Sequence, residues 1–237
     1  TLAGGTQAYA QSGSLATRWS LQPDFPVAIK QLIDLSGTGN KELVLIGAAG
    51  EVRHWRPQDK STDSKTLRGK LNLPDPAYSL VAIGSLTPNT PPKLVVFSPK
   101  GVVSYDLVEG VFGGQGQQLL SSRIRFTLRT GKPQVSRFMT DVNGDQRPDL
   151  IIPGTTHCSL YLNRPAENHS KASFTLTSRI ENEIETRASR GSEALSSNLS
   201  ASIQIPDLQT ADVNGDGRQD LVATKGQRNG YHMQRAD

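Results

Sequence analysis

The chain has 237 residues, a net charge of +4 and an apolar fraction of 35%. This length suffices for one large domain or two small ones with a substantial core, and the basic residues are scattered rather than gathered in blocks, which argues against a nucleic-acid interface. The longest apolar runs, such as Leu43–Ile46, are far too short to cross a bilayer, and the single cysteine, Cys158, excludes an intrachain disulfide.

Short, β-branched apolar segments bounded by Gly, Pro, Asn and Asp run through the whole chain. Such segments are typical of strands connected by turns, so we expect an all-β fold. The one segment with helical character is Ser178–Arg190, for which we expect a turn or two of helix.

The first repeating unit is expected over residues 27–78, after a preceding unit or linker over residues 1–26. It consists of a strand VAIKQLI, a polar loop that begins at Asp34, a strand ELVLIG, a tight turn and a strand EVRHW. The tail TLRGKLNL follows and is expected to form a fourth strand. The unit is therefore predicted to be a four-stranded antiparallel sheet, as in propeller blades.

The same frame recurs in degenerate form over residues 79–133. Ser85 occupies the first position of its loop and Lys93 the ninth, so this loop has no acidic residue at those positions. We therefore predict no metal ion in this loop. The tail RIRFTLRT, residues 123–130, is expected to form the fourth strand.

Two further units are expected over residues 134–204 and 205–237. Their loops are DVNGDQRPD, from Asp141, and DVNGDGRQD, from Asp212, and each loop runs into an apolar strand. The third unit continues with a strand SFTLTSRI and a long polar insertion, residues 163–204, which we expect on the rim. The fourth unit is expected to be incomplete, because it stops after its third strand.

The loop from Asp212 offers oxygen atoms at alternate positions 1, 3, 5, 7 and 9. These are the side chains of Asp212, Asn214, Asp216 and Asp220 and the carbonyl group of Arg218. Several carboxylates with no nitrogen or sulfur ligand select a hard cation, and six to eight oxygens at about 2.3–2.6 Å are the Ca²⁺ arrangement. We therefore predict Ca²⁺ in this loop and in its copy from Asp141.

A weaker version of this site is expected in the first unit. Its ligand positions are held by Asp34, Ser36, Thr38, Asn40 and Glu42, with only two carboxylates. An EF-hand is excluded for the two full loops, since it requires Glu at position 12 and flanking helices. Position 12 is Ile152 in one loop and Ala223 in the other, within predicted strands.

The two full loops, together with LYLN about ten residues after the first, resemble the FG-GAP/VCBS repeat of integrin α-subunit-like β-propellers. This resemblance implies a calcium-binding propeller, usually of seven blades, with Ca²⁺ in the loops between the first two strands of a blade. By position it assigns the ligands of the third unit as Asp141, Asn143, Asp145, Arg147 (through its carbonyl) and Asp149. Gln146 replaces the usual glycine at position 6.

About four blades do not close such a ring, and the chain begins without an initiator methionine. We therefore expect it to be part of a larger propeller, whose other blades come from the same or another chain. The resemblance implies a non-enzymatic interaction or adhesion scaffold outside the cytoplasm with a protein or glycan partner. A carbohydrate-binding lectin and the propeller domain of a larger secreted enzyme or toxin remain open alternatives.

No catalytic constellation is recognised in the sequence. Neighbouring strand residues point to opposite faces, so His157 and Cys158 are not expected to form a nucleophile–base pair, and Cys158 is expected to be a buried thiol. The aromatic residues expected to pack between blades, where one or two of them could line a sugar site, are Trp19, Trp55, Tyr105 and Tyr161.

Overall fold

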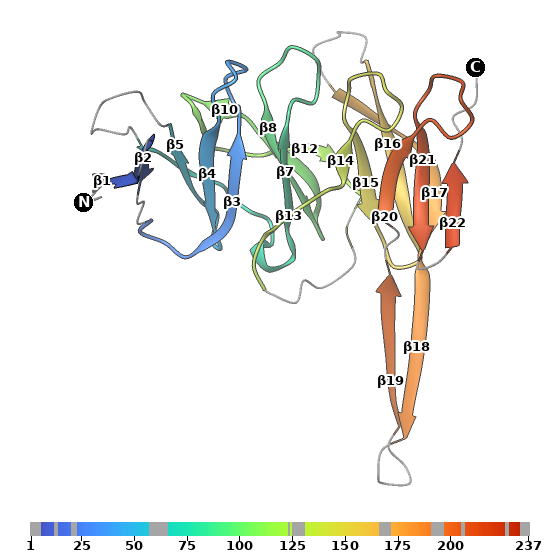
Figure 1. Cartoon of the computed structure of the whole chain (residues 1–237). Coiled ribbons are helices and arrows are strands. Elements are labelled where there is room, and N and C mark those ends of the chain that lie inside the picture. Colours follow the sequence, from blue (N-terminus) through green and yellow to red (C-terminus); the bar gives the residue numbers. More distant parts are fainter. Residues whose placement is uncertain are drawn as a thin grey trace.

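The structure is a computed structural model, and it describes residues 6–11, 14–19, 23–56, 66–122, 124, 131–165, 172–190, 197–204, 207–225 and 228–232. The predicted all-β class is confirmed, because these residues form several antiparallel sheets and no α-helix (Figure 1). A 3₁₀ turn covers Pro76–Tyr78. Within the described ranges no helix has the length and apolar character needed to span a membrane.

The first sheet has four antiparallel strands in chain order. They are β3 (Val27–Ile33), β4 (Glu42–Gly47), β5 (Glu51–Trp55) and β6 (Thr66–Lys70). The three strands and the fourth-strand tail expected for the first unit are all present. The polar loop joins β3 to β4, and the turn at Gly50 joins β4 to β5, where the Gly50 N–H donates to the Gly47 carbonyl at 3.2 Å.

The second sheet differs from its prediction at both edges. Its order is β12 (Gln117–Leu120), β9 (Gly101–Tyr105), β8 (Lys93–Ser98), β7 (Leu80–Gly84) and β13 (Gln134–Val135). The strand beside β9 is therefore β12, whereas residues 123 and 125–130 of the predicted strand lie outside the described residues. The other edge strand, β13, pairs with β7 in parallel. A short hairpin of β10 (Leu107–Val108) and β11 (Val111–Phe112) precedes β12.

The third and fourth sheets begin at the two acidic loops. The third consists of β14 (Met139–Thr140), β15 (Asp149–Pro153), β16 (His157–Pro165) and β17 (Ala172–Glu181). The fourth consists of β20 (Asp207–Ala211), β21 (Asp220–Lys225) and β22 (Arg228–His232). In both sheets the acidic loop joins the first strand to the second, as predicted.

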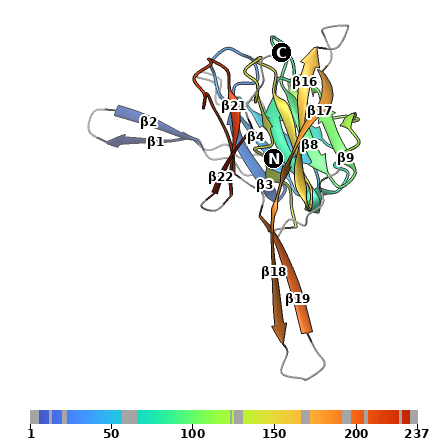
Figure 2. The ribbon, with the colours of Figure 1, turned by 90° about the vertical axis from the view of Figure 1, so that its right-hand side faces the viewer.

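Two hairpins extend away from these sheets (Figure 2). They are β1 (Thr6–Gln11) with β2 (Ser14–Trp19), and β18 (Glu183–Arg190) with β19 (Ser197–Gln204). The helical turns expected at Ser178–Arg190 are wrong, because this segment contains the end of β17 and all of β18. The polar insertion of the third unit accordingly holds a long hairpin, which pairs Glu183 with Gln204 at its base and Arg190 with Ser197 at its tip.

The sheets pack face to face and share three apolar cores. The first core joins the first and second sheets and includes Val44, Ile46, Val81, Leu94 and Val96. The second core joins the second and third sheets and includes Leu80, Val95, Phe97, Leu150 and Ile152. The third core joins the third and fourth sheets and includes Ile151, Cys158, Leu160, Leu221 and Ala223.

The central strands explain why the apolar runs in the sequence are continuous. Side chains of a strand alternate between the two faces of its sheet, so Leu94 and Val96 of β8 enter the first core while Val95 and Phe97 enter the second. Both faces of the second and third sheets are therefore covered by a neighbouring sheet. Each fully buried side chain of this kind contributes about 1.5–3 kcal/mol of transfer free energy.

Candidate functional site

The loops that follow β3, β7, β14 and β20 lie at the same end of their sheets (Figure 1). Each connects the first strand of a sheet to the second strand in an antiparallel pair. The sequence-predicted ligand positions are therefore gathered at one edge of the molecule rather than scattered over it.

Three of these loops have the same backbone turn. Positions 4 and 6 have positive φ angles in each of them: 70° and 84° at Gly37 and Gly39, 76° at Gly144, and 74° and 82° at Gly215 and Gly217. In the loop from Asp141, position 6 is Gln146, and its φ of 64° places it in the same left-handed region. The glycine replacement therefore leaves the turn unchanged.

The aspartate at position 1 holds this turn through backbone N–H groups. Gly144 and Gln146 donate to the two carboxylate oxygens of Asp141 at 2.8 and 2.7 Å. In the last loop, Gly215 and Gly217 donate to Asp212 at 2.7 and 2.9 Å.

The first loop repeats this arrangement at its own position 1. The Gly39 N–H donates to Asp34 Oδ2 at 2.6 Å. That bond and those from Gly37 and Thr38 stabilise the carboxylate and lower the pKa of Asp34, against a smaller effect of burial.

Positions 3, 5 and 7 are linked to each other in the two full loops. The Arg147 N–H donates to Asp145 Oδ1 at 2.8 Å, and the Asn143 amide donates to Asp145 Oδ2 at 3.1 Å. The matching distances at Asp216 are 2.9 Å from Arg218 and 2.9 Å from Asn214. The Arg218 N–H, with the Asn214 amide, lowers the pKa of Asp216, which stays ionised at neutral pH.

Position 9 is a buried aspartate at the start of the second strand. Asp149 and Asp220 both have 0% exposure. Asp149 accepts bonds from the Val142 and Asn163 N–H groups at 2.8 Å each, and Asp220 accepts one from Val213 at 3.1 Å. Burial, together with the nearby carboxylates of Asp145 and Asp141, raises the pKa of Asp149 to about 6 against the lowering effect of these hydrogen bonds.

Each full loop therefore brings its five predicted ligand residues into one turn, with the position-9 carboxylate beneath it. The carboxylates are directed at backbone N–H groups, and within the described residues no group of three Asp, Glu, His or Cys side chains converges on a metal position. The donor set nevertheless fits Ca²⁺, since it is made of oxygen alone and each carboxylate has about four lone-pair directions, more than these hydrogen bonds use.

The first loop does not fit in the same way. Glu42, its predicted position-9 ligand, is buried and lies against β5, where Arg56 Nε donates to Glu42 Oε2 at 2.7 Å and His54 Nε2 is 2.5 Å from the same oxygen. The other His54 nitrogen donates to the Gly110 carbonyl. Ser36 and Thr38 hydrogen-bond to each other at 2.8 Å, and no hydrogen bond or ion pair of the Asn40 side chain occurs within the described residues.

The second loop has an internal ion pair at the same position. Lys93 Nζ is 2.7 Å from Asp106 Oδ1, at the end of β9. The loop itself is closed by the Ser85 hydroxyl, which donates to the Thr90 carbonyl at 2.7 Å. In both of the first two sheets, the charge at position 9 is therefore paired with the residue that directly follows the third strand, Arg56 or Asp106.

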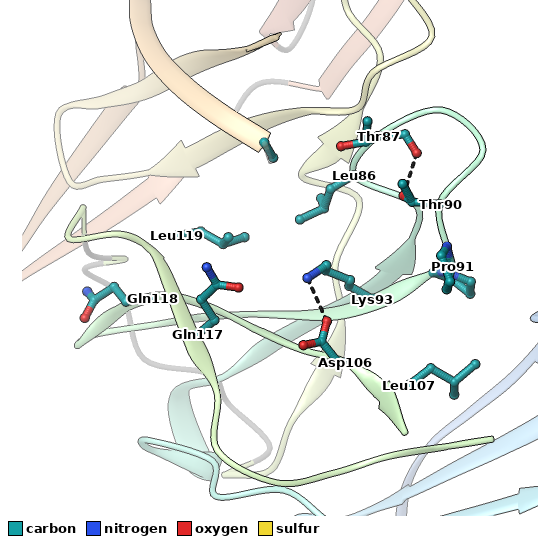
Figure 3. A pocket seen from close by; sticks show the side chains of 12 residues that line it. Leu86, Thr87, Thr90, Pro91, Lys93, Asp106, Leu107, Gln117, Gln118 and Leu119 are labelled. Atoms are coloured by element: carbon teal, nitrogen blue, oxygen red, sulfur yellow. Dashed lines mark hydrogen bonds and ion pairs between the residues drawn. The ribbon is translucent and has the colours of Figure 1, made fainter. Parts of the chain in front are cut away.

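A pocket of about 510 Å³ opens beside this ion pair, between the second and third sheets (Figure 3). Its lining is Leu86, Thr87, Thr90, Pro91, Pro92, Lys93, Asp106, Leu107, Gln117, Gln118, Leu119 and Ala172. In this view Leu86 lies above Lys93, and Gln117 lies to the left of the Lys93–Asp106 pair. We refer to this site as the loop-end pocket.

Neither the pocket nor its residues were predicted from sequence. Its walls come from the loop after β7, from β12 and from Ala172 of β17, which are far apart in the chain. No local motif carries such a site. The prolines and glutamines are the only compositional signal, and they equally fit an ordinary surface loop.

The aromatic and sulfur residues lie largely as expected. Trp55 and Tyr105 are buried, and the Tyr105 hydroxyl donates to the Asn72 carbonyl at 2.5 Å. Cys158 is fully buried, whereas His157 on the adjacent position is partly exposed. Tyr161 packs against the second core. The side chain of Trp19 lies outside the described residues.

Comparison with known proteins leaves the family open. No family model matches the chain, and no curated protein matches it. Among solved structures, the chain is similar to a lectin from Agrocybe aegerita whose specific recognition of non-reducing terminal N-acetylglucosamine was studied. The two share 15% identity over 88% of this chain and 68% of the lectin chain, with a TM-score of 0.45. A likeness at this level identifies neither a family nor a ligand.

Proposed function

We propose that the chain forms part of a calcium-stabilised β-propeller that serves as a non-enzymatic interaction scaffold. The face-to-face packing of successive sheets and the position of their first loops at one end support this architecture. Propellers have 4–8 blades. In this proposal the four sheets are blades of a larger ring, of about seven, whose other blades come from the same or another chain.

Ca²⁺ is proposed for the two full loops, and one observation carries the proposal. Asp149 is buried beneath its turn with the carboxylates of Asp141 and Asp145 close enough to oppose its ionisation. Like charges about 4 Å apart cost on the order of 1–4 kcal/mol per pair, depending on the effective dielectric. A divalent cation held by the loop oxygens removes that repulsion. In the last loop the equivalent residues are Asp212, Asp216 and Asp220.

Calorimetric titration of the chelator-treated chain with Ca²⁺ tests this proposal. We expect binding to two loops, abolished in one loop by Asp145→Ala and in the other by Asp216→Ala. Asp106→Asn is the matched control. Asp106 pairs with Lys93, which holds position 9 of the loop proposed to lack calcium, so this variant should leave Ca²⁺ binding unchanged. If chelation changes neither the melting temperature nor proteolysis of the loops, structural calcium is wrong.

The proposed location is outside the cytoplasm. Loops of this type in extracellular modules bind Ca²⁺ with a Kd of about 10⁻⁴–10⁻³ M, and they would fill only in calcium-rich fluid. The proposed partner is a protein or a glycan. The alternative is the propeller domain of a larger secreted enzyme or toxin, with the active site in another domain. Peptide sequencing of the intact secreted protein by mass spectrometry distinguishes the two, because only the alternative requires a domain outside the propeller.

A lectin is the second candidate, and the loop-end pocket favours it. Binding sites for small molecules commonly have volumes of about 300–1,000 Å³ and place a few polar groups among apolar ones. Here the Lys93–Asp106 pair and Gln117 lie beside Leu86 and Leu119. A glycan array probed with the wild-type chain and with Asp106→Asn tests this candidate. The absence of any hit with wild type removes it.

A further inference from the structure

A second pocket lies between the second and third sheets at the end opposite the acidic loops. Its volume is about 440 Å³, and its walls are the turn between β15 and β16, the first half of β16, the residues after β12, and one residue of β17. We refer to it as the turn-end pocket. It is distinct from the loop-end pocket, whose single β17 residue is Ala172 at the other end of that strand.

Each polar side chain that lines the turn-end pocket can donate a hydrogen bond. Ser121, Ser122 and Ser159 contribute hydroxyl groups, His157 an imidazole and Arg179 a guanidinium group. No aspartate or glutamate is among the described residues that line it. A guanidinium group has five N–H donors arranged to bind a carboxylate, sulfate or phosphate group, and hydroxyls complete the shell of such an anion.

The guanidinium of Arg179 is available for such a ligand. The strand register places Arg179 opposite Ser159, so the two side chains share the face that lines the pocket. No hydrogen bond or ion pair of Arg179 to another described residue occurs in the structure. The nearest acid along the strand is Glu181, which the register places opposite His157 on the same face.

The surrounding turn is held in place before any ligand arrives. The Asn182 side chain donates to the Gly154 carbonyl at 2.8 Å, and the Asn182 N–H donates to the Thr156 carbonyl at 2.9 Å. The Gly154 N–H donates to the His157 carbonyl at 3.0 Å. On the opposite wall the Tyr161 and Ser122 hydroxyls are hydrogen-bonded. The backbone of this wall therefore needs no rearrangement on binding, and the ordering of the exposed Arg179 side chain is the main conformational cost.

We propose that the turn-end pocket binds the oxyanion group of a small ligand, with Arg179 as its charged contact. The volume accommodates a sugar acid as well as a free inorganic anion. The site is independent of the calcium loops, because its residues lie at the other end of the sheets.

Calorimetric titration of the full chain at constant ionic strength tests this proposal. The probes are sodium sulfate, inorganic phosphate, glucuronate and uncharged glucose. We expect the charged probes to bind and glucose not to bind. If glucuronate is the one probe that binds, the ligand is a carboxylated sugar. If only sulfate or phosphate binds, the ligand is an inorganic anion. The absence of binding by all three charged probes at about 20 mM, far above the Kd of about 1 mM expected of a specific small-molecule site, overturns the proposal.

Matched variants locate the binding. Arg179→Gln is expected to weaken it at least about tenfold, as for loss of a charge-assisted hydrogen bond, and Glu181→Gln to strengthen it severalfold. Arg164→Gln is the control, because it removes an exposed arginine near the other end of β16. Equal losses in the two arginine variants would show non-specific attraction and sink the idea. Ser159→Ala gives an independent decision if Arg179→Gln does not fold: unchanged affinity contradicts the site.

Discussion

Replacing Gln146 by glycine should stabilise the chain. Gln146 is exposed and has a φ of 64°, whereas the equivalent position of the last loop is Gly217 with a φ of 82°. A left-handed conformation costs an L-residue roughly 1–2 kcal/mol. The Gln146 N–H bond to Asp141 belongs to the backbone and is kept in the variant.

The gain is reduced by the greater freedom of glycine in the unfolded chain, about 0.5–1 kcal/mol. The net stabilisation expected for Gln146→Gly is therefore about 0.5–1 kcal/mol, or a few degrees in Tm for a chain of this size. Gly217→Gln should lose a similar amount, because a Cβ at Gly217 meets no heavy atom within 4 Å and only the backbone angle opposes it.

Urea denaturation of both variants beside wild type measures these differences, with chelator present so that metal occupancy is equal. Gln115→Gly is the control, since Gln115 is exposed and has no positive φ; it should destabilise by about 0.5–1 kcal/mol. If Gln146→Gly is no more stable than wild type, or if the two loop variants shift in the same direction, the left-handed angle is not the cause.

Three further outcomes follow from buried or strained positions. Glu42→Gln should lower the unfolding free energy by about 1.5–3 kcal/mol in urea denaturation, because it removes the charged partner of Arg56. Gly50→Ala should cost about 2–4 kcal/mol in Tm-derived stability, since its Cβ would lie 2.4 Å from the Leu71 carbonyl oxygen at a φ of 86°. The backbone N–H of Glu51, and after it the nearby Lys70, lower the pKa of the Glu51 carboxyl group. The contribution of this carboxylate to stability should therefore be present above about pH 4.5 and be lost as pH falls through the lower folded-state pKa. In Glu51→Gln, the unfolding free energy measured as a function of pH should vary less across this range.

The strands that frame the loops could be predicted because each is encoded in one contiguous segment. VAIKQLI and ELVLIG correspond to β3 and β4 without change, and the two DVNGD loops lie between strands as expected. The nine-residue spacing contains the whole turn, so the hydrogen bonds accepted by Asp141, Asp145, Asp212 and Asp216 are local. Sequence alone therefore predicted the framework and the candidate ligand positions.

Pairings between distant segments could not be predicted in this way. The parallel contact of β13 with β7 depends on how the chain returns past the second sheet. Ile180 and Ile184 are four residues apart, which indicates a helix in a local window, yet Ile180 pairs with β16 and Ile184 pairs with β19. The partner of Glu42 is Arg56, and only the register of β4 with β5 reveals that this glutamate lies against the third strand rather than the loop.

The apolar interior of this molecule is divided into three cores, each shared by two neighbouring sheets, rather than gathered into one. A substitution in one core alters only the two sheets that share it, and its effect reaches a more distant sheet solely through the sheet between them. The second sheet places Val96 in the first core and Val95 in the second core, so a change of packing in either core can reach the other through this sheet. A ligand in either pocket between the second and third sheets would therefore stabilise the packing of those two sheets and affect the first and fourth sheets only through them.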